Sequence, residues 1–413
     1  MKDKIVITAV SAVTPLGNSV ELITEKLLNG ISGIDLITRY DLNDFPVKHG
    51  GQADISILDN IEYPVANPNL QFKLFYYCVS KLFSSFNHNY SCEKIGCALG
   101  TDPNTSTVED IENLFKRYND SIDEKYYKFD TSKLDNINPS LLMYHLSKDF
   151  GVNGPCLCNL GTCSASTQAI GTAYRLLQNR TVDMMIAGGV SSKIDPISIA
   201  RLCRLKALEN TRENVRENCK PFDKKREGFT IAEGCVLFIM ERECDALKRG
   251  AEILCEVSGY GAALDGFSIT DPHDEAMGMV LSMKRAIEDS GATVDNIDYI
   301  NAHGTATVKN DLYETKAIKQ VFGKKAYEID ISSTKSMHGH MMTAAGAMEV
   351  LVCMIAINNG VVPPTINYCS IDEECNLNYT PNISKKLEIN HALTNSFGLG
   401  GQNASLIISK YTG

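Results

Sequence analysis

Residues 159–166, NLGTCSAS, place Cys163 among small side chains at the start of a helical pattern. In residues 166–178, STQAIGTAYRLLQ, apolar side chains recur near helical spacing, so we expect the thiol just before a helix. Unpaired backbone N–H groups and the helix dipole favour an anion there, and such a thiol can have its pKa lowered by about one unit or more from about 8.5. Most free cysteines are instead small buried hydrophobes, so Cys163 alone leaves both interpretations open.

Strand and helix patterns alternate on both sides of this turn. Up to a break near Arg249 and Gly250, we expect strands at 4–10, 94–99, 182–190 and 234–240 and helices at 20–28, 72–86 and 166–178. Beyond the break, we expect strands at 253–257, 297–301 and 404–409 and helices at 275–290, 313–322 and 344–358. This order predicts an α/β fold with layered sheets.

For three segments the sequence also predicts whether they are buried or exposed. The apolar run VDMMIAGGV at 182–190 is typical of a central parallel strand. Residues 201–220 mix basic and acidic side chains and are expected to be exposed, and the charged region 102–135 is expected to be a surface excursion.

Hydrophobic residues make up 44% and charged residues 22% of the 413 residues, as in ordinary globular proteins. This length predicts either two domains or one large fold of two similar halves. No apolar run reaches the roughly eighteen residues of a membrane helix, and the N-terminus lacks a convincing signal peptide, so we expect a cytoplasmic protein with no membrane partner. A net charge of −10 without a long basic run argues against a nucleic-acid partner.

The 14 cysteines are scattered through the chain, and without a secretion signal we expect reduced thiols. Cys156, Cys158 and Cys163 are close together but lack paired CxxC spacing and a nearby histidine. A metal site there is therefore not favoured.

Two histidine motifs favour the nucleophile interpretation of Cys163. NAHGTAT at 301–307 follows a predicted strand, which places His303 at a strand's carboxyl end, where open α/β sheets build their sites. SSTKSMHGH at 332–340 is a second small-residue turn before a predicted helix. A cysteine and two histidines in such turns form a plausible nucleophile and proton-handling set.

The run NSFGLGGQN at 395–403 is flexible and poor in side chains. Such backbone can offer N–H groups to a developing oxyanion. It is equally consistent with a tight turn before the last strand.

Taken together, these motifs make the chain resemble a β-ketoacyl-[acyl carrier protein] synthase, a condensing enzyme of dissociated fatty-acid and polyketide systems. The resemblance spans nearly the whole chain, through ITAVSAVTPLGN, GTCSAS, KPFDKKREGF, NAHGTAT, SSTKSMHGHMMTAAGAME and NSFGLGGQN. It implies a thiolase-like fold with duplicated α/β/α/β/α layered halves, here residues 1–250 with the nucleophile and 251–413 with the catalytic histidines. It also implies a dimer.

The resemblance assigns a role to each motif residue. Cys163 would carry the acyl chain as a thioester, and His303 and His340 would stabilise the enolate left when malonyl-carrier protein loses carbon dioxide. The backbone N–H groups of Cys163 and Leu399 would form the oxyanion hole, and Lys335 would orient the histidines. The reaction would be a decarboxylative Claisen condensation that adds two carbons.

Further positions follow from the same resemblance. The supporting residues would be Asp311, Glu314, Glu349 and Phe397. A structural monovalent or divalent cation could be held at Asn301, Ala302, Glu349, Asn395 and Ser396. No dissociable cofactor is required beyond the phosphopantetheine that the acyl carrier protein brings.

The implied partners are an acyl carrier protein and either a second copy of the chain or a chain-length-factor subunit. Basic candidates for docking the acidic carrier are Lys73, Arg201, Arg204 and Lys206. KNDLYET resembles the QNDxxET form of dissociated polyketide synthases, which leaves fatty-acid, polyketide and polyene chains open.

Three residues depart from the family pattern. Leu399 stands where many fatty-acid enzymes carry a gating phenylalanine, His338 replaces a small residue, and Gln402 replaces threonine. A third histidine beside His340 would either perturb its pKa or fill space.

Three alternatives belong to other classes. A non-catalytic chain-length factor would share the fold but lack the nucleophile. A coenzyme A thiolase needs a second cysteine near the C-terminal turn, whereas Cys369 and Cys375 lie in a polar connection. A cysteine protease has no use for two histidines.

Overall fold

The computed structural model describes residues 3–59, 61–65, 68–102 and 138–413. Of the expected surface excursion at 102–135, all residues except Asp102 lie outside the described part. Asp102 itself is buried, so for this residue the expectation is wrong.

Ten strands form one mixed sheet in the order β10-β9-β13-β14-β8-β1-β7-β6-β4-β5. The strands of the first half are β1 Ile5–Val13, β4 Ile95–Thr101, β5 Cys156–Asn159, β6 Met184–Ser191 and β7 Gly234–Arg242. Those of the second half are β8 Cys255–Leu264, β9 Tyr299–Asn301, β10 Asp330–Ser332, β13 His391–Gly398 and β14 Gln402–Ser409. Short strand pairs flank the sheet: β2 Asp35–Leu36 with β3 His49–Gly50, and β11 Val361–Val362 with β12 Lys385–Lys386.

The two halves repeat one topology. Counted along the chain, each half arranges its five strands in the spatial order first, fifth, fourth, second, third. The halves join where β1 pairs antiparallel with β8, from Ile5 opposite Val257 to Ile7 opposite Cys255. This shared order is a structural duplication, although a boundary between independent domains near residue 250 stays a prediction.

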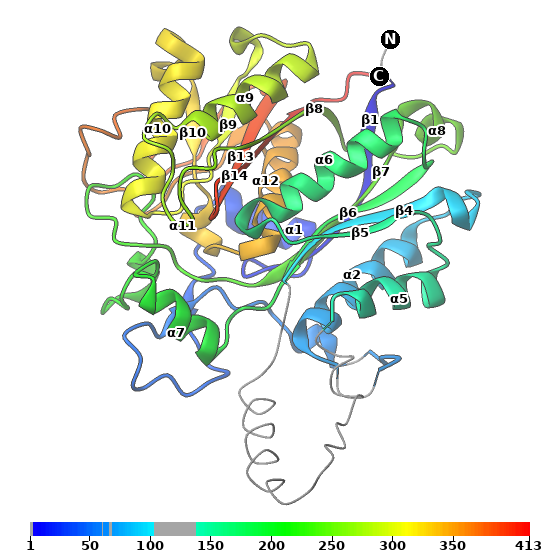
Figure 1. Cartoon of the computed structure of the whole chain (residues 1–413), viewed down its shortest axis with the longest axis horizontal. Helices are drawn as coiled ribbons and strands as arrows, with labels where there is room; N and C mark the ends of the chain where they lie inside the picture. Colours follow the sequence, from blue (N-terminus) through cyan, green and yellow to red (C-terminus); the bar gives the residue numbers. More distant parts are fainter. Residues whose placement is uncertain (1–2, 60, 66–67, 103–137) are drawn as a thin grey trace, which may run out of the picture.

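Helices cover both faces of each half-sheet (Figure 1). The central pair is α6 Ala165–Gln178 and α12 Ala345–Asn359, with α2 Leu70–Ser85 and α5 Ser140–Phe150 outside the first half and α9 Met277–Ser290 and α10 Val308–Phe322 outside the second. Among the described residues, the remaining helices are α1 Val20–Leu28, α7 Pro196–Arg204, α8 Glu243–Lys248 and α11 Lys335–His338. The arrangement is the expected α/β/α/β/α layering.

Among the described residues, the three largest clusters of the core lie on the faces of the sheet. On β7, Val236 and Phe238 face the central helices, whereas Leu237 and Ile239 face α2 and α5. A third cluster lies between the second half-sheet and α9 and α10. Because both faces of the sheet are covered, its strands read as continuous apolar runs in the sequence.

Each central helix is entered through the same kind of turn. A 3₁₀ turn at Thr162–Ser164 precedes α6, and one at Met342–Ala344 precedes α12. The first residue of each turn has a left-handed backbone, with φ of 51° at Thr162 and 48° at Met342. The duplication therefore includes the approach to both central helices, and it places Thr343 where the first half has Cys163.

The span Met342–Asn359, which includes α12, is long and apolar enough to cross a membrane. However, 83% of that span is buried inside the protein. Its apolar composition is accounted for by its place in the central layer.

Most predicted elements occur within a few residues of their expected bounds, with three differences. β6 runs parallel to β4 but antiparallel to β7, so it is not a wholly parallel strand. Within 201–220, Arg201, Arg204 and Lys206 are exposed as expected, whereas Leu208, Glu209 and Cys219 are buried. The C-terminal run is not flexible: residues 395–398 end the buried strand β13, and only the following turn to β14 is open.

The contact between α6 and α12 depends on a glycine. A Cβ at Gly346 would lie 1.9 Å from Thr167 Oγ1 and 2.9 Å from the Thr167 backbone nitrogen. The two central helices can approach this closely only because Gly346 has no side chain.

We expect Gly346→Ala to lower the free energy of unfolding by about 1–3 kcal/mol, because overpacking at this contact outweighs the roughly 1 kcal/mol that alanine adds to an α-helix. Urea denaturation would measure the change. Asn358→Ala, at an exposed position of the same helix, is the matched control. Equal stability of the two variants would contradict a close helix contact.

Candidate active site

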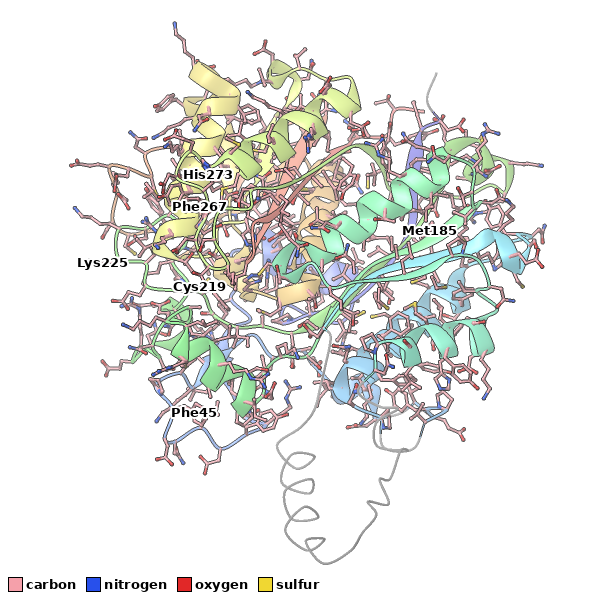
Figure 2. The ribbon with its side chains drawn as sticks, viewed as in Figure 1. Phe45, Met185, Cys219, Lys225, Phe267 and His273 are labelled. Carbon is pink, nitrogen blue, oxygen red and sulfur yellow. The ribbon has the colours of Figure 1, made fainter. Side chains whose placement is uncertain are left out.

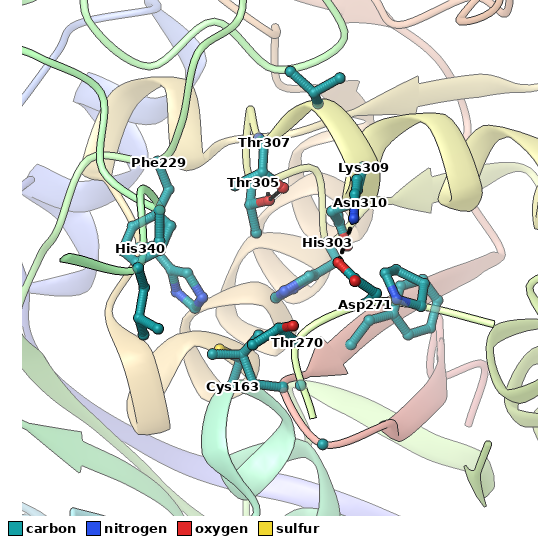
Figure 3. Close-up of a pocket in the computed structure, with 18 of the residues that line it drawn as sticks. Cys163, Phe229, Thr270, Asp271, His303, Thr305, Thr307, Lys309, Asn310 and His340 are labelled. Atoms are coloured by element: carbon teal, nitrogen blue, oxygen red, sulfur yellow. Dashed lines mark hydrogen bonds and ion pairs between the residues drawn. The ribbon is translucent and has the colours of Figure 1, made fainter. Parts of the chain in front are cut away.

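Cys163 lies in the 3₁₀ turn before α6, as the sequence predicts, and is 7% exposed. Asn159 Oδ1 accepts the Gly161 N–H at 2.7 Å, and the Ser164 N–H bonds Gly161 O at 3.2 Å, which shapes the turn. The Cys163 sulfur and ring nitrogens of His303 and His340 all lie within 4.8 Å of one another (Figure 3). The fold thus brings together three residues far apart in the sequence.

His303 follows β9, and its backbone is held by a buried carboxylate. Glu314 accepts the N–H of His303 at 2.8 Å and that of Gly304 at 2.7 Å. Lys335 Nζ donates to His303 O at 2.6 Å and lies 3.3 Å from His303 Nδ1. Because an ammonium can only donate, Nδ1 is the acceptor, which assigns the imidazole proton to Nε2.

His340 has the same tautomer for a different reason. The Met342 backbone N–H donates to His340 Nδ1 at 3.2 Å, so the ring proton resides on Nε2. His340 Nε2 has no hydrogen-bond partner among the described residues. The rings of His303 and His340 lie 5.3 Å apart and nearly perpendicular. The two Nε2–H groups can therefore donate hydrogen bonds to the same small region of the site.

Both imidazoles are neutral. Burial, and then the Lys335 ammonium, holds the pKa of His303 and of His340 well below the usual value. The triad Cys163, His303 and His340 has the donor types of a zinc site. However, the adjacent ammonium and the lack of a carboxylate among these three ligands disfavour a second cation there.

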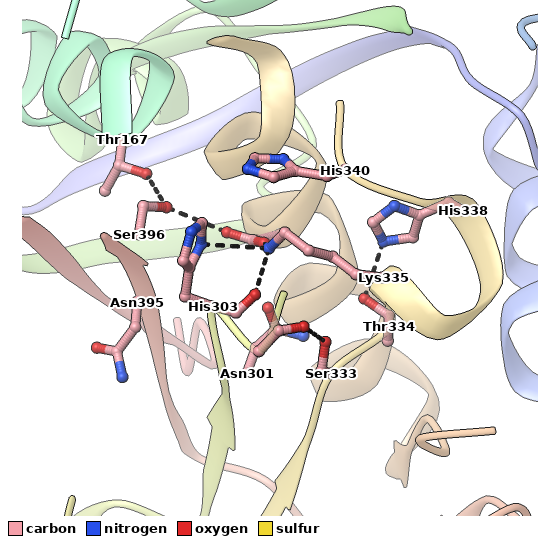
Figure 4. A network of polar contacts seen from close by, with 12 residues as sticks. Thr167, Asn301, His303, Ser333, Thr334, Lys335, His338, His340, Asn395 and Ser396 are labelled. Atoms are coloured by element: carbon pink, nitrogen blue, oxygen red, sulfur yellow. Dashed lines mark hydrogen bonds and ion pairs between the residues drawn. The ribbon is translucent and has the colours of Figure 1, made fainter. Parts of the chain in front are cut away.

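Lys335 is the charged centre of the site. Its ammonium pairs with Glu349, which also accepts the Ser396 hydroxyl at 3.1 Å, and Ser396 accepts from Thr167 at 2.6 Å (Figure 4). Burial lowers the pKa of Lys335 to about 8, while the Glu314 carboxylate opposes this shift. A lysine that looks like a surface charge in the sequence is 1% exposed.

The expected lowering of the Cys163 pKa is wrong. Burial raises the pKa of the Cys163 thiol to about 11, although Lys335 and the backbone N–H groups of Leu399 and Cys163 each lower it. Desolvation of the thiolate outweighs the favourable effect of the helix start because the sulfur is buried at the inner end of a mostly apolar pocket. The backbone N–H groups of Cys163 and Leu399 both lie close enough to the thiol to lower its pKa, and their role as an oxyanion hole stays a prediction.

The remaining supporting residues lie behind these groups. Asp311 accepts the backbone N–H groups of Phe222 at 2.7 Å and Ala306 at 3.2 Å, which holds the turn after His303. The buried Phe397 ring lies 6.0 Å from the His303 ring. Burial raises the pKa of Asp311 and that of Glu314, the latter to about 7.

The cation expected at Asn301, Ala302, Glu349, Asn395 and Ser396 stays a prediction. Glu349 and Ser396 belong to the Lys335 network, and Asn395 Oδ1 accepts the Ser405 hydroxyl at 2.8 Å. Asn301 Oδ1 has no hydrogen-bond partner among the described residues. No cation enters the mechanism below.

The structure explains two of the three residues that depart from the family pattern, His338 and Gln402. His338 is buried, with Nδ1 2.7 Å from Gly339 O and Nε2 3.0 Å from Thr334 Oγ1, so both ring nitrogens are satisfied. It fills space, and it also contributes to the lowered pKa of His340. Gln402 Oε1 accepts from Gln168 at 3.3 Å, which ties β14 to the nucleophile helix.

A pocket of about 710 Å³ leads from the surface to Cys163. Arg204, Lys206 and Leu399 lie at its mouth and are exposed, and Arg201 is exposed on the same helix, α7. Lys73 lines a separate depression on α2. Another part of the pocket wall is formed by Asp271 and Pro272, which lie on the loop between β8 and α9. Phe267 is on the same loop (Figure 2).

Some wall residues were not assigned from the sequence. The Phe229 ring lies 5.1 Å from the His340 ring, and the Thr305 and Thr307 hydroxyls are 2.9 Å apart. Phe229 ends the KPFDKKREGF motif, which could have indicated it. The Met342 N–H that sets the His340 tautomer has no side-chain signal in the sequence.

A thiol at the entry of a central helix, with two neutral imidazoles beside it, is the arrangement expected of a carbon–carbon condensing enzyme of the acyltransferase class. Residues 2–246 match the family model "Beta-ketoacyl synthase, N-terminal domain", and residues 254–369 match "Beta-ketoacyl synthase, C-terminal domain". The chain therefore belongs to the beta-ketoacyl synthase family.

Individual relatives agree with this membership. The "3-oxoacyl-[acyl-carrier-protein] synthase 2" of Synechocystis sp. is 34% identical, with 99% of each chain covered. A structure of AntDE:AntF, a type II polyketide synthase acyl-carrier protein in complex with its ketosynthase bound to the hexaketide, matches with a TM-score of 0.89, 27% identity and full coverage of both chains. The ishigamide ketosynthase/chain length factor matches with a TM-score of 0.89, 26% identity and full coverage of both. The expected thiolase-like fold is confirmed, and the non-catalytic alternative is not favoured.

A pKa of about 11 predicts that alkylation of Cys163 by iodoacetamide keeps rising through about pH 9 without levelling off, because only the thiolate reacts. Peptide mass spectrometry would follow Cys163 separately from the other thiols. Lys335→Met should slow alkylation at pH 8, since it removes the cation that lowers the thiol pKa. A plateau at or below about pH 8.5 would show that burial is not the dominant effect.

Proposed function

We propose that the chain elongates an acyl chain held on Cys163 with malonyl-acyl carrier protein. In the first half-reaction, the Cys163 sulfur attacks the acyl thioester of the carrier. The carrier's pantetheine sulfur leaves and takes the thiol proton. The oxygen of the tetrahedral intermediate accepts hydrogen bonds from the backbone N–H groups of Cys163 and Leu399.

In the second half-reaction, the Nε2–H groups of His303 and His340 bind the thioester oxygen of the malonyl group. The bond to its carboxylate breaks, carbon dioxide leaves, and the electron pair forms an enolate whose oxygen both donors stabilise. The enolate carbon attacks the acyl carbon on Cys163, and the sulfur leaves and regains a proton. The observation that carries this proposal is the pair of neutral imidazoles presenting Nε2–H beside the thiol.

Lys335 would act through the imidazoles. Its ammonium holds the His303 tautomer and keeps both rings neutral, while Glu349 fixes the ammonium. Neutral rings suit this task because an imidazolium would lose a proton to the enolate instead of holding it.

We further propose an acyl carrier protein as the donor of both substrates, with phosphopantetheine as the only prosthetic group required, and a cytoplasmic location. Arg204 and Lys206 at the pocket mouth, with Arg201 exposed on α7, support docking of an acidic carrier there, and Lys73 would belong to a more distant contact. The product is a fatty-acid, polyketide or polyene chain, and its length and saturation are to be read from the acyl groups that load onto Cys163.

Pairing with a second subunit is also proposed. β5 is an edge strand of the sheet, and Leu157 on it is 45% exposed, as is typical of a strand that pairs with another chain. The partner would be a second copy or a chain-length-factor subunit.

Cys163→Ala should abolish acylation by acyl-carrier protein, measured by intact-protein mass spectrometry, because no other thiol lies in the oxyanion hole among the described residues. His340→Ala should still be acylated, but condensation should fall by about 100-fold or more, the usual cost of losing an oxyanion donor. A wild-type chain that never becomes acylated, or a His340→Ala variant that condenses normally, would refute the proposal.

Reversing the charge at the mouth, with Arg204→Glu and Lys206→Glu together, should raise the KM for acyl-carrier protein about tenfold at low salt and leave a small acyl-pantetheine substrate unaffected. Lys324→Glu, exposed in another part of the surface, is the matched control. If the double variant and the control behave alike, the carrier docks elsewhere, and Lys73→Glu then tests the surface of α2.

A further inference from the structure

A buried carboxylate close to the site has no role in the reaction above. Asp102 follows β4 and is 3% exposed. Its Oδ2 accepts the Ser191 hydroxyl at 2.8 Å and the Ser192 N–H at 3.4 Å, both at the end of β6. Its Oδ1 lies 3.1 Å from the hydroxyl of Thr343, in the turn before α12. Asp102 therefore joins the ends of two strands to that turn.

The turn contains the residue that sets the tautomer of His340. The Met342 N–H donates to His340 Nδ1, and Met342 has a left-handed backbone with φ of 48°. A non-glycine residue in this conformation costs roughly 1–3 kcal/mol and persists only where its surroundings impose it. The next residue, Thr343, is held by Asp102 and by Val190 O, which lies 2.9 Å from its hydroxyl.

We propose, resting on the function above, that Asp102 is a positioning residue for His340: by holding Thr343, it maintains the left-handed Met342 whose N–H keeps the His340 proton on Nε2. The Thr343 hydroxyl has one proton and two acceptors, so it bridges Asp102 and the end of β6. Loss of either the Asp102 carboxylate or the Thr343 hydroxyl releases the turn before α12. The Met342 N–H is then no longer held at Nδ1 of His340.

The charge of Asp102 gives the proposal a second readout. Lys193 faces Asp102 from beyond β6, and the Cys163 thiol faces it from the turn before α6. The carboxylate contributes to the raised pKa of Cys163, whereas an amide would not. Asparagine can keep the contacts, with its oxygen on Ser191 and its N–H group on Thr343, while Thr343 donates to Val190 O.

The test compares Asp102→Ala, Asp102→Asn and Thr343→Val, with Asp295→Asn at an exposed position as the control. Acylation of Cys163 and release of carbon dioxide from malonyl-carrier protein are measured separately. We expect Asp102→Ala and Thr343→Val to lower kcat for carbon dioxide release about tenfold, as loss of a buried hydrogen bond would, with acylation retained. Asp102→Asn should recover most of that loss and should also speed alkylation of Cys163 at pH 8.

Normal carbon dioxide release by Thr343→Val would overturn the inference, and so would an Asp102→Asn variant as slow as Asp102→Ala. Equal losses of acylation and carbon dioxide release in Asp102→Ala and Thr343→Val would also overturn it, because a merely structural role affects both. If Asp102→Ala does not fold, Thr343→Val decides alone, since it removes one hydroxyl without changing shape. A wild-type chain that releases no carbon dioxide refutes the proposed function itself.

Discussion

The buried ion pair between Lys335 and Glu349 is the interaction on which the site depends. A charge in the interior is tolerated only when it is paired and hydrogen-bonded, and the partners here come from different helices and strands. Glu349 lies on α12, its second ligand Ser396 on β13, and Thr167, which completes the chain of hydrogen bonds, on α6. The ammonium then contacts both the carbonyl and the ring of His303. The contacts that join the central helices to β13 therefore also hold the ammonium that fixes the protonation of the His303 ring.

Burial, more than charge, sets the chemical character of the groups around Cys163. The thiol is protonated and both histidines are neutral, so the resting site holds uncharged donors around an uncharged nucleophile. Such a site is suited to thioesters, whose uncharged carbonyl oxygen can accept hydrogen bonds from neutral donors. The single cation is held at the back, where it orients a donor instead of binding substrate.

The sequence was sufficient for most of the elements and for the turns that carry Cys163 and His303, but not for the environments of these residues. Helix α1 occurs at its predicted bounds, and Cys163 precedes its helix as expected, because both depend on local spacing. β13 was missed because Asn395, Ser396 and Gly398 are poor strand formers that only tertiary packing makes into a strand. The pKa of Cys163 and the burial of Asp102 were likewise mispredicted, since desolvation depends on residues distant in the sequence.

The duplicated turn before each central helix has a consequence for how such an enzyme can change. The fold carries two equivalent positions, one occupied by Cys163 and the other by Thr343. Thr343 has no part in the proposed reaction, but its turn lies in the half that supplies His303 and His340. Substitutions at this second position can therefore adjust the geometry around His340 without altering the thiol.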